Sequence, residues 1–247
     1  IGKKSKKAFF EKLSSKKKDQ VLKDYRKFIK KNKDLIINKN KIDIKNANKK
    51  KLKNNLIKRL TLDDKKISNI IISIKKIIKL KDPLNIILEK WKRPSGLNIS
   101  KVSIAIGVIG VIYESRPNVT SDVASLCFKS GNPVILRGGS EAFYSNQILS
   151  KLFRKSLKKN KVDENFVQFI TSTKRNVVDF LLTKMSKFID VIIPRGGKGL
   201  VKKVQSLSSI PTIGHLEGVC HSYVDKDANP EIAKNLIHNA KLRNTAI

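Results

Sequence analysis

GVIGVIYESRPNVT (residues 107–120) and SGNPVILRGGSEAFYSN (residues 130–146) are the two stretches that decide how this chain folds. In order, they give an apolar strand, a polar loop, a helix, a second strand, a Gly-Gly turn and a second helix. Strands and helices that alternate in this way build α/β proteins, which bind nucleotides at the carboxyl ends of parallel strands. The sequence therefore predicts an α/β fold with a nucleotide site at that edge of its sheet.

The same alternation continues toward the end of the chain. Short apolar runs predict strands at residues 108–113, 134–137, 166–170, 189–193, 211–213 and 222–224. Helical patterns are expected at residues 120–130, 140–159, 176–186, 198–207 and 229–240. Because parallel strands are joined by crossovers of about this length, we predict a doubly wound parallel sheet with helices on both faces.

The first 92 residues differ, because they are predicted to form helices rich in lysine. Asp19 is the expected N-cap of one helix, and Asp63 lies at the start of another. The isoleucines from Ile67 to Ile78 recur at the spacing of an amphipathic helix that packs on a core. Residues 38–55, mostly Lys and Asn, are typical of a solvated loop or of a helix surface.

Beyond these helices, apolar and polar residues alternate from Leu97 to Ile106. A period of two favours extended structure, so this run predicts a ribbon.

The charge of the chain needs an explanation, because its 247 residues carry a formal net charge of +34. Such a charge attracts polyanions, which makes a basic nucleic-acid-binding protein one hypothesis. However, nine of the 54 basic residues are Arg, which leaves 45 Lys, and aromatic residues make up 6% of the chain. Base readers favour Arg, and single-strand binders interleave aromatic residues with charge. We therefore attribute the lysines to an AT-rich codon bias and predict no specific nucleic-acid partner.

Two further features bear on location. No apolar run reaches the about 18 residues that span a bilayer. Two cysteines do not make a disulfide framework. We expect a cytoplasmic protein with no membrane partner.

Arg137-Gly138-Gly139-Ser140-Glu141 is the first loop with chemical interest. Its glycines permit a sharp turn and a close approach to a ligand. Ser140 is suited to capping the next helix and Glu141 to its positive end, where free N–H groups attract phosphate or ribose oxygens. The spacing alone also fits an ordinary αβ turn.

Two other loops follow predicted strands. Residues 114–120, ESRPNVT, place charged and amide side chains between a strand and a helix, where open sheets bind ligands. Residues 192–199, IIPRGGKG, lack the spacing of a P-loop. Their shape indicates either an anion site or a tight turn.

The neighbouring Cys220 and His221 suggest a thiolate pair. However, adjacent residues of a strand point to opposite faces, so we expect Cys220 to be buried and not paired with His221. Cys127 is expected on the core face of a helix. Because His215 and His221 lack further ligands, no metal site is predicted.

These motifs, and GHLEGVCHSYVD followed by NAKLRNTAI near the end, closely resemble the γ-glutamyl phosphate reductase family of the aldehyde dehydrogenase superfamily. The resemblance covers essentially the whole chain. It implies a helical N-terminal part of the cofactor domain at 1–92, an oligomerisation ribbon at 93–106, a Rossmann-like NADP-binding core at 107–214 and the start of a catalytic domain at 215–247.

The resemblance also implies roles for residues. Arg137 would hold the 2′-phosphate of NADP(H), beside Gly138, Gly139, Ser140 and Glu141. Asn118 is the candidate donor to the developing oxyanion. Ser115, Arg116 and Pro117 would lie along the cofactor or the acyl phosphate, and Arg195, Gly196 and Gly197 would lie near the cofactor.

The implied reaction is the NADPH-dependent reduction of γ-glutamyl phosphate, in the second step of proline synthesis from glutamate. A cysteine thiolate displaces phosphate to give a thioester, and hydride transfer then yields glutamate 5-semialdehyde. The implied partners are identical subunits and, functionally, glutamate 5-kinase. In the family the nucleophilic cysteine follows the NAK segment, so we expect this chain to bind cofactor without catalysing.

One alternative is another oxidoreductase of the aldehyde dehydrogenase superfamily. A hydrolytic member would be expected to keep a carboxylate base near residue 215, where Glu217 is the candidate.

Overall fold

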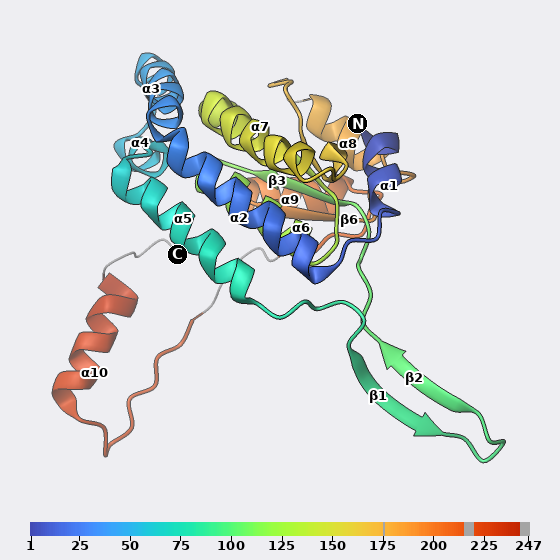
Figure 1. Cartoon of the computed structure of the whole chain (residues 1–247). Coiled ribbons are helices and arrows are strands. Elements are labelled where there is room, and N and C mark those ends of the chain that lie inside the picture. Colours follow the sequence, from blue (N-terminus) through green and yellow to red (C-terminus); the bar gives the residue numbers. More distant parts are fainter. Residues whose placement is uncertain (175, 215–219, 243–247) are drawn as a thin grey trace. The chain divides into compact units, whose positions relative to one another are not determined.

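The computed structural model describes residues 1–174, 176–214 and 220–242, which fall into two compact units, residues 1–214 and 215–247 (Figure 1). Its helices are α1 (Gly2–Phe9), α2 (Ser15–Lys31), α3 (Lys33–Lys49), α4 (Asn54–Leu60), α5 (Asp64–Lys79), α6 (Asn118–Lys129), α7 (Phe143–Lys159), α8 (Asn176–Lys184), α9 (Lys198–Leu207) and α10 (Pro230–Ile237). Its strands are β1 (Ile87–Lys92), β2 (Asn98–Val102), β3 (Ile109–Tyr113), β4 (Val134–Gly138), β5 (Val167–Phe169) and β6 (Val191–Arg195). Within the described ranges, no helix is long and apolar enough to cross a membrane.

The four strands β3 to β6 form one parallel sheet in the order β5-β4-β3-β6. The chain builds outward from β3 through β4 to β5 and then crosses back to place β6 on the other side of β3. This reversal creates a switch point between β3 and its two neighbours, which is where open α/β sheets bind ligands. Tyr113, Gly138 and Arg195 are paired across the three strands, so their carboxyl ends meet at one edge.

Both faces of the sheet are covered, because successive side chains of a buried strand point to opposite sides. Val111 and Tyr113 pack in a core with α2, α5, α6 and α7. Ile112 packs in a second core with α8 and α9. The predicted doubly wound α/β class is confirmed.

The N-terminal helices begin where their caps allow. Asp63 lies at the start of α5 as predicted, and it also caps the helix by accepting a hydrogen bond from the backbone N of Lys66 at 2.7 Å. Ser14, not Asp19, caps α2, by accepting from the backbone N of Lys17 at 3.2 Å. Asp19 lies inside α2 and forms an ion pair with Lys129 instead. Helix α3 occupies most of the lysine- and asparagine-rich segment, so the helix alternative for residues 38–55 holds up to Lys49.

The antiparallel hairpin of β1 and β2 projects from the first unit (Figure 1). Strand β2 lies inside the predicted ribbon. Strand β1 lies in a part of the chain where the sequence predicted helices. The strand was not predicted because its six residues are all exposed and therefore carry no alternating apolar pattern.

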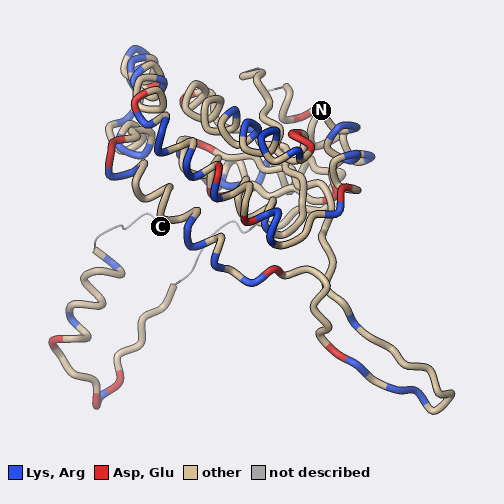
Figure 2. Tube along the Cα trace, in the orientation of Figure 1, with Lys and Arg blue, Asp and Glu red and all other residues tan. Residues whose placement is uncertain are grey.

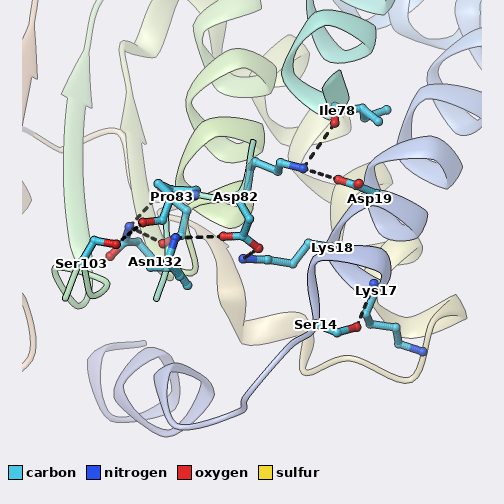
Figure 3. A network of polar contacts seen from close by, with 12 residues as sticks. Ser14, Lys17, Lys18, Asp19, Ile78, Asp82, Pro83, Ser103 and Asn132 are labelled. Atoms are coloured by element: carbon cyan, nitrogen blue, oxygen red, sulfur yellow. Dashed lines mark hydrogen bonds and ion pairs between the residues drawn. The ribbon is translucent and has the colours of Figure 1, made fainter. Parts of the chain in front are cut away.

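A polar network anchors the base of this hairpin (Figure 3). The ammonium of Lys18, on a side chain only 1% exposed, forms an ion pair of 2.6 Å with Asp82. Asp82 also accepts from the backbone N of Leu84 at 3.1 Å, and Ser103 donates to the carbonyl of Pro83 at 2.5 Å. Helix α2 is therefore tied to the segment before β1, and that segment in turn is bonded to Ser103 after β2.

The C-terminal end of the chain departs from its predicted strands. Residues 211–213 contribute a single bridge, between Thr212 and Ile192, and residues 222–224 form no strand. In the second unit, Asn229 caps α10 by accepting from the backbone N of Glu231 and Ile232 at 3.0 and 3.1 Å.

Candidate functional site

A cleft of about 750 Å³ lies at the carboxyl edge of the sheet, within the first unit. It is bounded by the ends of β3 and β4, by the α3–α4 connection and by α9. Five of the predicted cofactor residues line it together: Ser115, Arg137, Gly139, Ser140 and Glu141. A cavity of this size at a switch point is the expected place for a nucleotide.

Glu141 joins two loops of this cleft. Its Oε1 accepts from the backbone N of Ser115 at 2.8 Å and from its hydroxyl at 2.7 Å. Ser115 has a backbone φ of +27°, a value that residues other than glycine seldom adopt. The Glu141 carboxylate thus holds the loop after β3 in an unusual conformation against the loop after β4.

Gly138 and Gly139 are needed for space. A Cβ on Gly138 would lie 2.2 Å from Nδ2 of the buried Asn146, and one on Gly139 would lie 2.2 Å from Oε1 of Glu141. The φ of Gly139 is −58°, an ordinary value for any residue. The glycines therefore let Asn146 and Glu141 approach the backbone closely.

The N-terminus of α7 is capped from another helix. Ser140 makes no side-chain cap, contrary to the sequence expectation. Instead Asp43 of α3 accepts from the backbone N of Tyr144 at 3.1 Å and from the backbone N and hydroxyl of Ser145 at 2.8 and 2.6 Å. The amides that the sequence analysis assigned to a ligand are thus occupied by a carboxylate of the protein.

The sequence analysis missed Asp43 and its neighbour Asn40. Asn40 donates to the carbonyl of Leu60 at 2.9 Å and accepts from the backbone N of Leu62 at 2.7 Å. The signal was present, because the buried residues of α3 are Ile36, Asn40, Asp43 and Ala47, spaced as one helical face. The buried face was not recognised from the sequence because two of its four residues, Asn40 and Asp43, are polar.

Arg137 lies in the wall of the cleft and is 8% exposed. Its Nη1 donates to the carbonyl of Gly138 at 2.8 Å and its Nη2 to that of Thr173 at 3.3 Å. Burial lowers the pKa of its guanidinium, which the charge of Glu141 partly offsets. Arg137 ties strand β4 to the segment after β5.

The loop after β6 reaches the cleft through α9. The backbone N of Gly197 donates to Oε2 of Glu114 at 2.9 Å, and the backbone N of Glu114 donates to the carbonyl of Arg195 at 3.2 Å. Gly199 and Leu200, in the first turn of α9, line the cleft. Helix α9 has no side-chain N-cap among its own residues, and the Glu114 carboxylate that accepts from Gly197 lies at its positive end.

A second cleft, of about 520 Å³, is lined by two more of the predicted site residues, Arg116 and Asn118. It lies between α4, α5 and the start of α6, and Asp122 forms part of its wall. The Asn118 amide donates to Oδ2 of Asp122 at 3.1 Å, and the Ser73 hydroxyl donates to Oδ1 at 2.8 Å. Ser115 and Arg116, adjacent in one loop, therefore line different clefts.

Neither cysteine lines these two clefts. Cys127 is buried in α6 as expected, and burial raises the pKa of its thiol to about 12. Cys220 is exposed, so the expectation of a buried side chain is wrong. His215 and Glu217 lie outside the described residues.

The comparisons with known proteins point in one direction. No family model matches the chain. It is 46% identical over 192 residues to the gamma-glutamyl phosphate reductase of Bartonella tribocorum, covering 78% of this chain and 47% of that protein. It is 43% identical over 238 residues to that of Thermodesulfovibrio yellowstonii, covering 96% and 57%.

Solved structures agree. The gamma-glutamyl phosphate reductase of Thermotoga maritima superposes with a TM-score of 0.91 at 35% identity, covering 98% of this chain and 59% of that one. An engineered glycolyl-CoA reductase with bound NADP+ shares the fold at 16% identity, with a TM-score of 0.63, over 86% of this chain and 45% of that one. The chain spans about half the length of the curated relatives it matches.

Proposed function

Because this chain is a homologue of the gamma-glutamyl phosphate reductases, we propose that it forms the cofactor-binding part of an enzyme that reduces γ-glutamyl phosphate to glutamate 5-semialdehyde. The reaction releases phosphate and is the second step of proline synthesis from glutamate. The observation that carries this proposal is the cleft at the sheet edge, where five residues matched to the family's cofactor loops converge.

We propose NADP(H) as the cofactor. When bound, it supplies the hydride. The chain's own residues fit such a nucleotide, because the first turn of α9 borders the cleft and the apolar Val178 and Leu200 provide walls for a flat ring. Lys203 is paired with Asp179, so Arg137 and Lys50 are the lining cations that suit an additional phosphate, beside the carboxylates of Glu114 and Glu141. Gly196 and Gly197 precede α9 and would shape the approach to it.

Ser115, Arg116, Pro117 and Asn118 would form the divide between cofactor and substrate. The Asn118 amide has a second N–H beyond the one donated to Asp122, and we propose that it donates to the oxygen that develops negative charge. This role requires the amide to face the reacting carbonyl in the complex.

We propose that neither Cys127 nor Cys220 is the nucleophile, because neither lines the two clefts. Cys127 is unsuited, because a buried thiol whose pKa is about 12 is protonated at neutral pH. The 247-residue chain should then bind NADPH and show no turnover with γ-glutamyl phosphate. Measurable NADPH oxidation by this chain would contradict the assignment.

A fluorescence titration with NADPH and NADH tests the cofactor proposal. We expect saturable binding that prefers NADPH. Ser140→Asp should weaken NADPH more than NADH, because a carboxylate in the cleft wall repels a 2′-phosphate. Ser100→Asp, an equal charge change on exposed β2, is the control. Absence of binding, or equal effects of the two variants, would count against the site.

The basic side chains do not redirect this proposal to nucleic acid. Lys and Arg are distributed along α1 to α5, α7 and the hairpin (Figure 2). A sliding or sequence-reading protein concentrates charge on the face that meets the duplex. The distribution supports a general lysine bias of the chain.

We also propose that the enzyme acts in the cytoplasm as a homo-oligomer, supplied by the kinase that makes its acyl phosphate. The hairpin supports self-association, because Leu88, Trp91 and Leu97 are 57%, 44% and 61% exposed. Leu88→Asp should lower the oligomeric mass measured by light scattering, with Glu89→Asp as the control on the same strand. An unchanged mass for Leu88→Asp would count against the hairpin as an interface.

A further inference from the structure

The second cleft contains two arginine side chains whose guanidinium groups are not bonded to other described residues. Within residues 1–174, 176–214 and 220–242, the guanidinium groups of Arg59 and Arg116 have no hydrogen-bond or ion-pair partner. Lys66, in the same cleft, is committed differently. Its ammonium donates to the carbonyls of Lys58 and Thr61 at 2.5 and 2.7 Å, which fastens α4 to the start of α5.

The electrostatics of this cleft are unbalanced. Arg116 is half-buried, and burial lowers the pKa of its guanidinium, with the charges of Arg59 and Arg195 lowering it further. Arg59 and Arg195 thus each repel Arg116, and Arg59 is the one of the two that lines the same cleft. Asp122 is the one carboxylate among the described lining residues, and both of its oxygens already accept from Ser73 and Asn118.

A bound anion would relieve this imbalance. The half-buried Arg116, which the exposed Arg59 repels, is stabilised by an opposite charge. Guanidinium groups bind phosphate oxygens bidentately, with charge-assisted hydrogen bonds about twice as strong as neutral ones. Lys58 adds positive charge at the rim of the same cleft.

We propose that this cleft binds the phosphoryl group of the acyl phosphate substrate between Arg59 and Arg116. The inference rests on the proposed reductase function and adds Arg59 of α4 as a substrate-recognition residue. Because Ser115 lines the cofactor cleft and Arg116 lines this one, a single loop would separate cofactor from substrate. The phosphate leaves with the bonding electron pair when the thiolate displaces it, and the two guanidinium groups would stabilise that charge.

Binding of inorganic phosphate and of acetyl phosphate to the 247-residue chain, measured by calorimetry, tests the proposal. Arg59→Gln and Arg116→Gln should each weaken both ligands about tenfold or more, as expected for loss of a charge-assisted contact. Arg59→Lys keeps the charge but lacks the fork and should give an intermediate loss. Arg93→Gln, an equal charge change in the exposed hairpin turn, is the matched control and should change neither affinity.

The outcomes separate this proposal from the proposed function. Equal losses in Arg93→Gln and Arg59→Gln would overturn the site and indicate charge-driven binding only. Competition between NADPH and phosphate for one site would also overturn it, because the cleft would then belong to the cofactor. Phosphate affinity that depends on Arg59 in a chain that binds no NADPH would uphold the anion site while refuting the reductase. Free glutamate should bind much more weakly than acetyl phosphate, and the reverse order would assign the cleft to a carboxylate.

Discussion

Two clefts of the first unit, the one at the sheet edge and the one between α4, α5 and α6, use charge in opposite ways. In the sheet-edge cleft proposed for NADP(H), called the cofactor cleft below, Glu141 accepts from Ser115 and Arg137 donates to two backbone carbonyls. Lys203 forms an ion pair with Asp179 at 2.6 Å. In the second cleft, between α4, α5 and the start of α6 and called the basic cleft below, the guanidinium groups of Arg59 and Arg116 have no such partners in the described part of the chain.

The difference separates two tasks. A cofactor cleft must keep its shape, and internally satisfied polar groups hold loops in place before the ligand arrives. A substrate cleft that recognises a phosphate must keep charge available for it, at some cost to the ligand-free protein. The predictions below test this contrast, from the largest expected effect to the smallest.

Gly138→Ala should have the largest effect, because its Cβ would meet the buried Asn146 amide at 2.2 Å and the Tyr113 ring at 3.0 Å. We expect the free energy of unfolding to fall by about 3 kcal/mol, as in overpacked cores, and NADPH affinity to fall with it. Gly199→Ala is the matched control, since its Cβ would meet nothing within 4 Å. Urea unfolding of both variants measures the effect, and equal losses would show that the cleft floor is not tightly packed.

Asp43→Ala removes the cap of α7. Three hydrogen bonds are lost at once, so we expect a decrease of about 2 kcal/mol in unfolding free energy, the upper end of capping effects. Asp34→Ala, in the first turn of α3, is the control with an equal charge change. A loss as small as that of the control would mean that α7 does not depend on α3.

The cap also gives a pH dependence. Burial, and to a lesser extent the charge of Glu141, outweigh the hydrogen bonds from Ser145 and Tyr144 and raise the pKa of Asp43. Such a group stabilises the fold most below its ordinary pKa of about 3.9 and loses that contribution as pH rises through the raised value. The stability gap between the natural chain and Asp43→Ala should therefore narrow from about pH 4 upward, and a widening gap would contradict the assignment.

Glu141→Gln tests the loop contact of the cofactor cleft. The amide oxygen still accepts from Ser115, but without charge assistance, so we expect a loss of about 1 kcal/mol in unfolding free energy and weaker NADPH binding. Glu164→Gln breaks a half-exposed ion pair with Arg154 and should cost less, about 0.5 kcal/mol. If NADPH affinity is unchanged in Glu141→Gln, the contact does not preorganise the cleft.

Arg59→Gln, in the basic cleft, should not lower the free energy of unfolding as the preceding substitutions do. Removing a positive charge that repels Arg116 should leave the ligand-free chain equally stable or more stable, by on the order of 0.5 kcal/mol, while phosphate binding falls. Thermal unfolding with and without phosphate measures both. A ligand-free variant that is clearly less stable would show that Arg59 has a structural partner and would erase the contrast between the clefts.

The fold class was predictable because the sheet depends on local patterns. The apolar runs of β3 and β4, each followed by a polar loop and an apolar helix, indicate buried parallel strands without knowledge of their neighbours. The loops at their carboxyl ends were predictable for the same reason. Strand β1 was not, because exposed strands lack a buried face to reveal them.

The cap of α7 could not be predicted from local sequence. Ser140 precedes the helix and has the right chemistry, yet Asp43, 102 residues before Ser145, supplies the carboxylate. Likewise, the sequence grouped Ser115, Arg116 and Asn118 into one loop, whereas backbone geometry divides them between two clefts. Such pairings arise from tertiary packing, which overrides local preference.

The contacts of helix α1 join residues that the ribosome synthesises far apart in time. Ser5 donates to the carbonyl of Asn165, and Lys6 pairs with Asp190 at 2.7 Å, a separation of 184 residues. At roughly 5–20 residues per second, the ribosome makes Asp190 about 10–40 s after Lys6. The basic, amphipathic helix α1 therefore emerges well before these partners and cannot form its native contacts until Asn165 and Asp190 have been made.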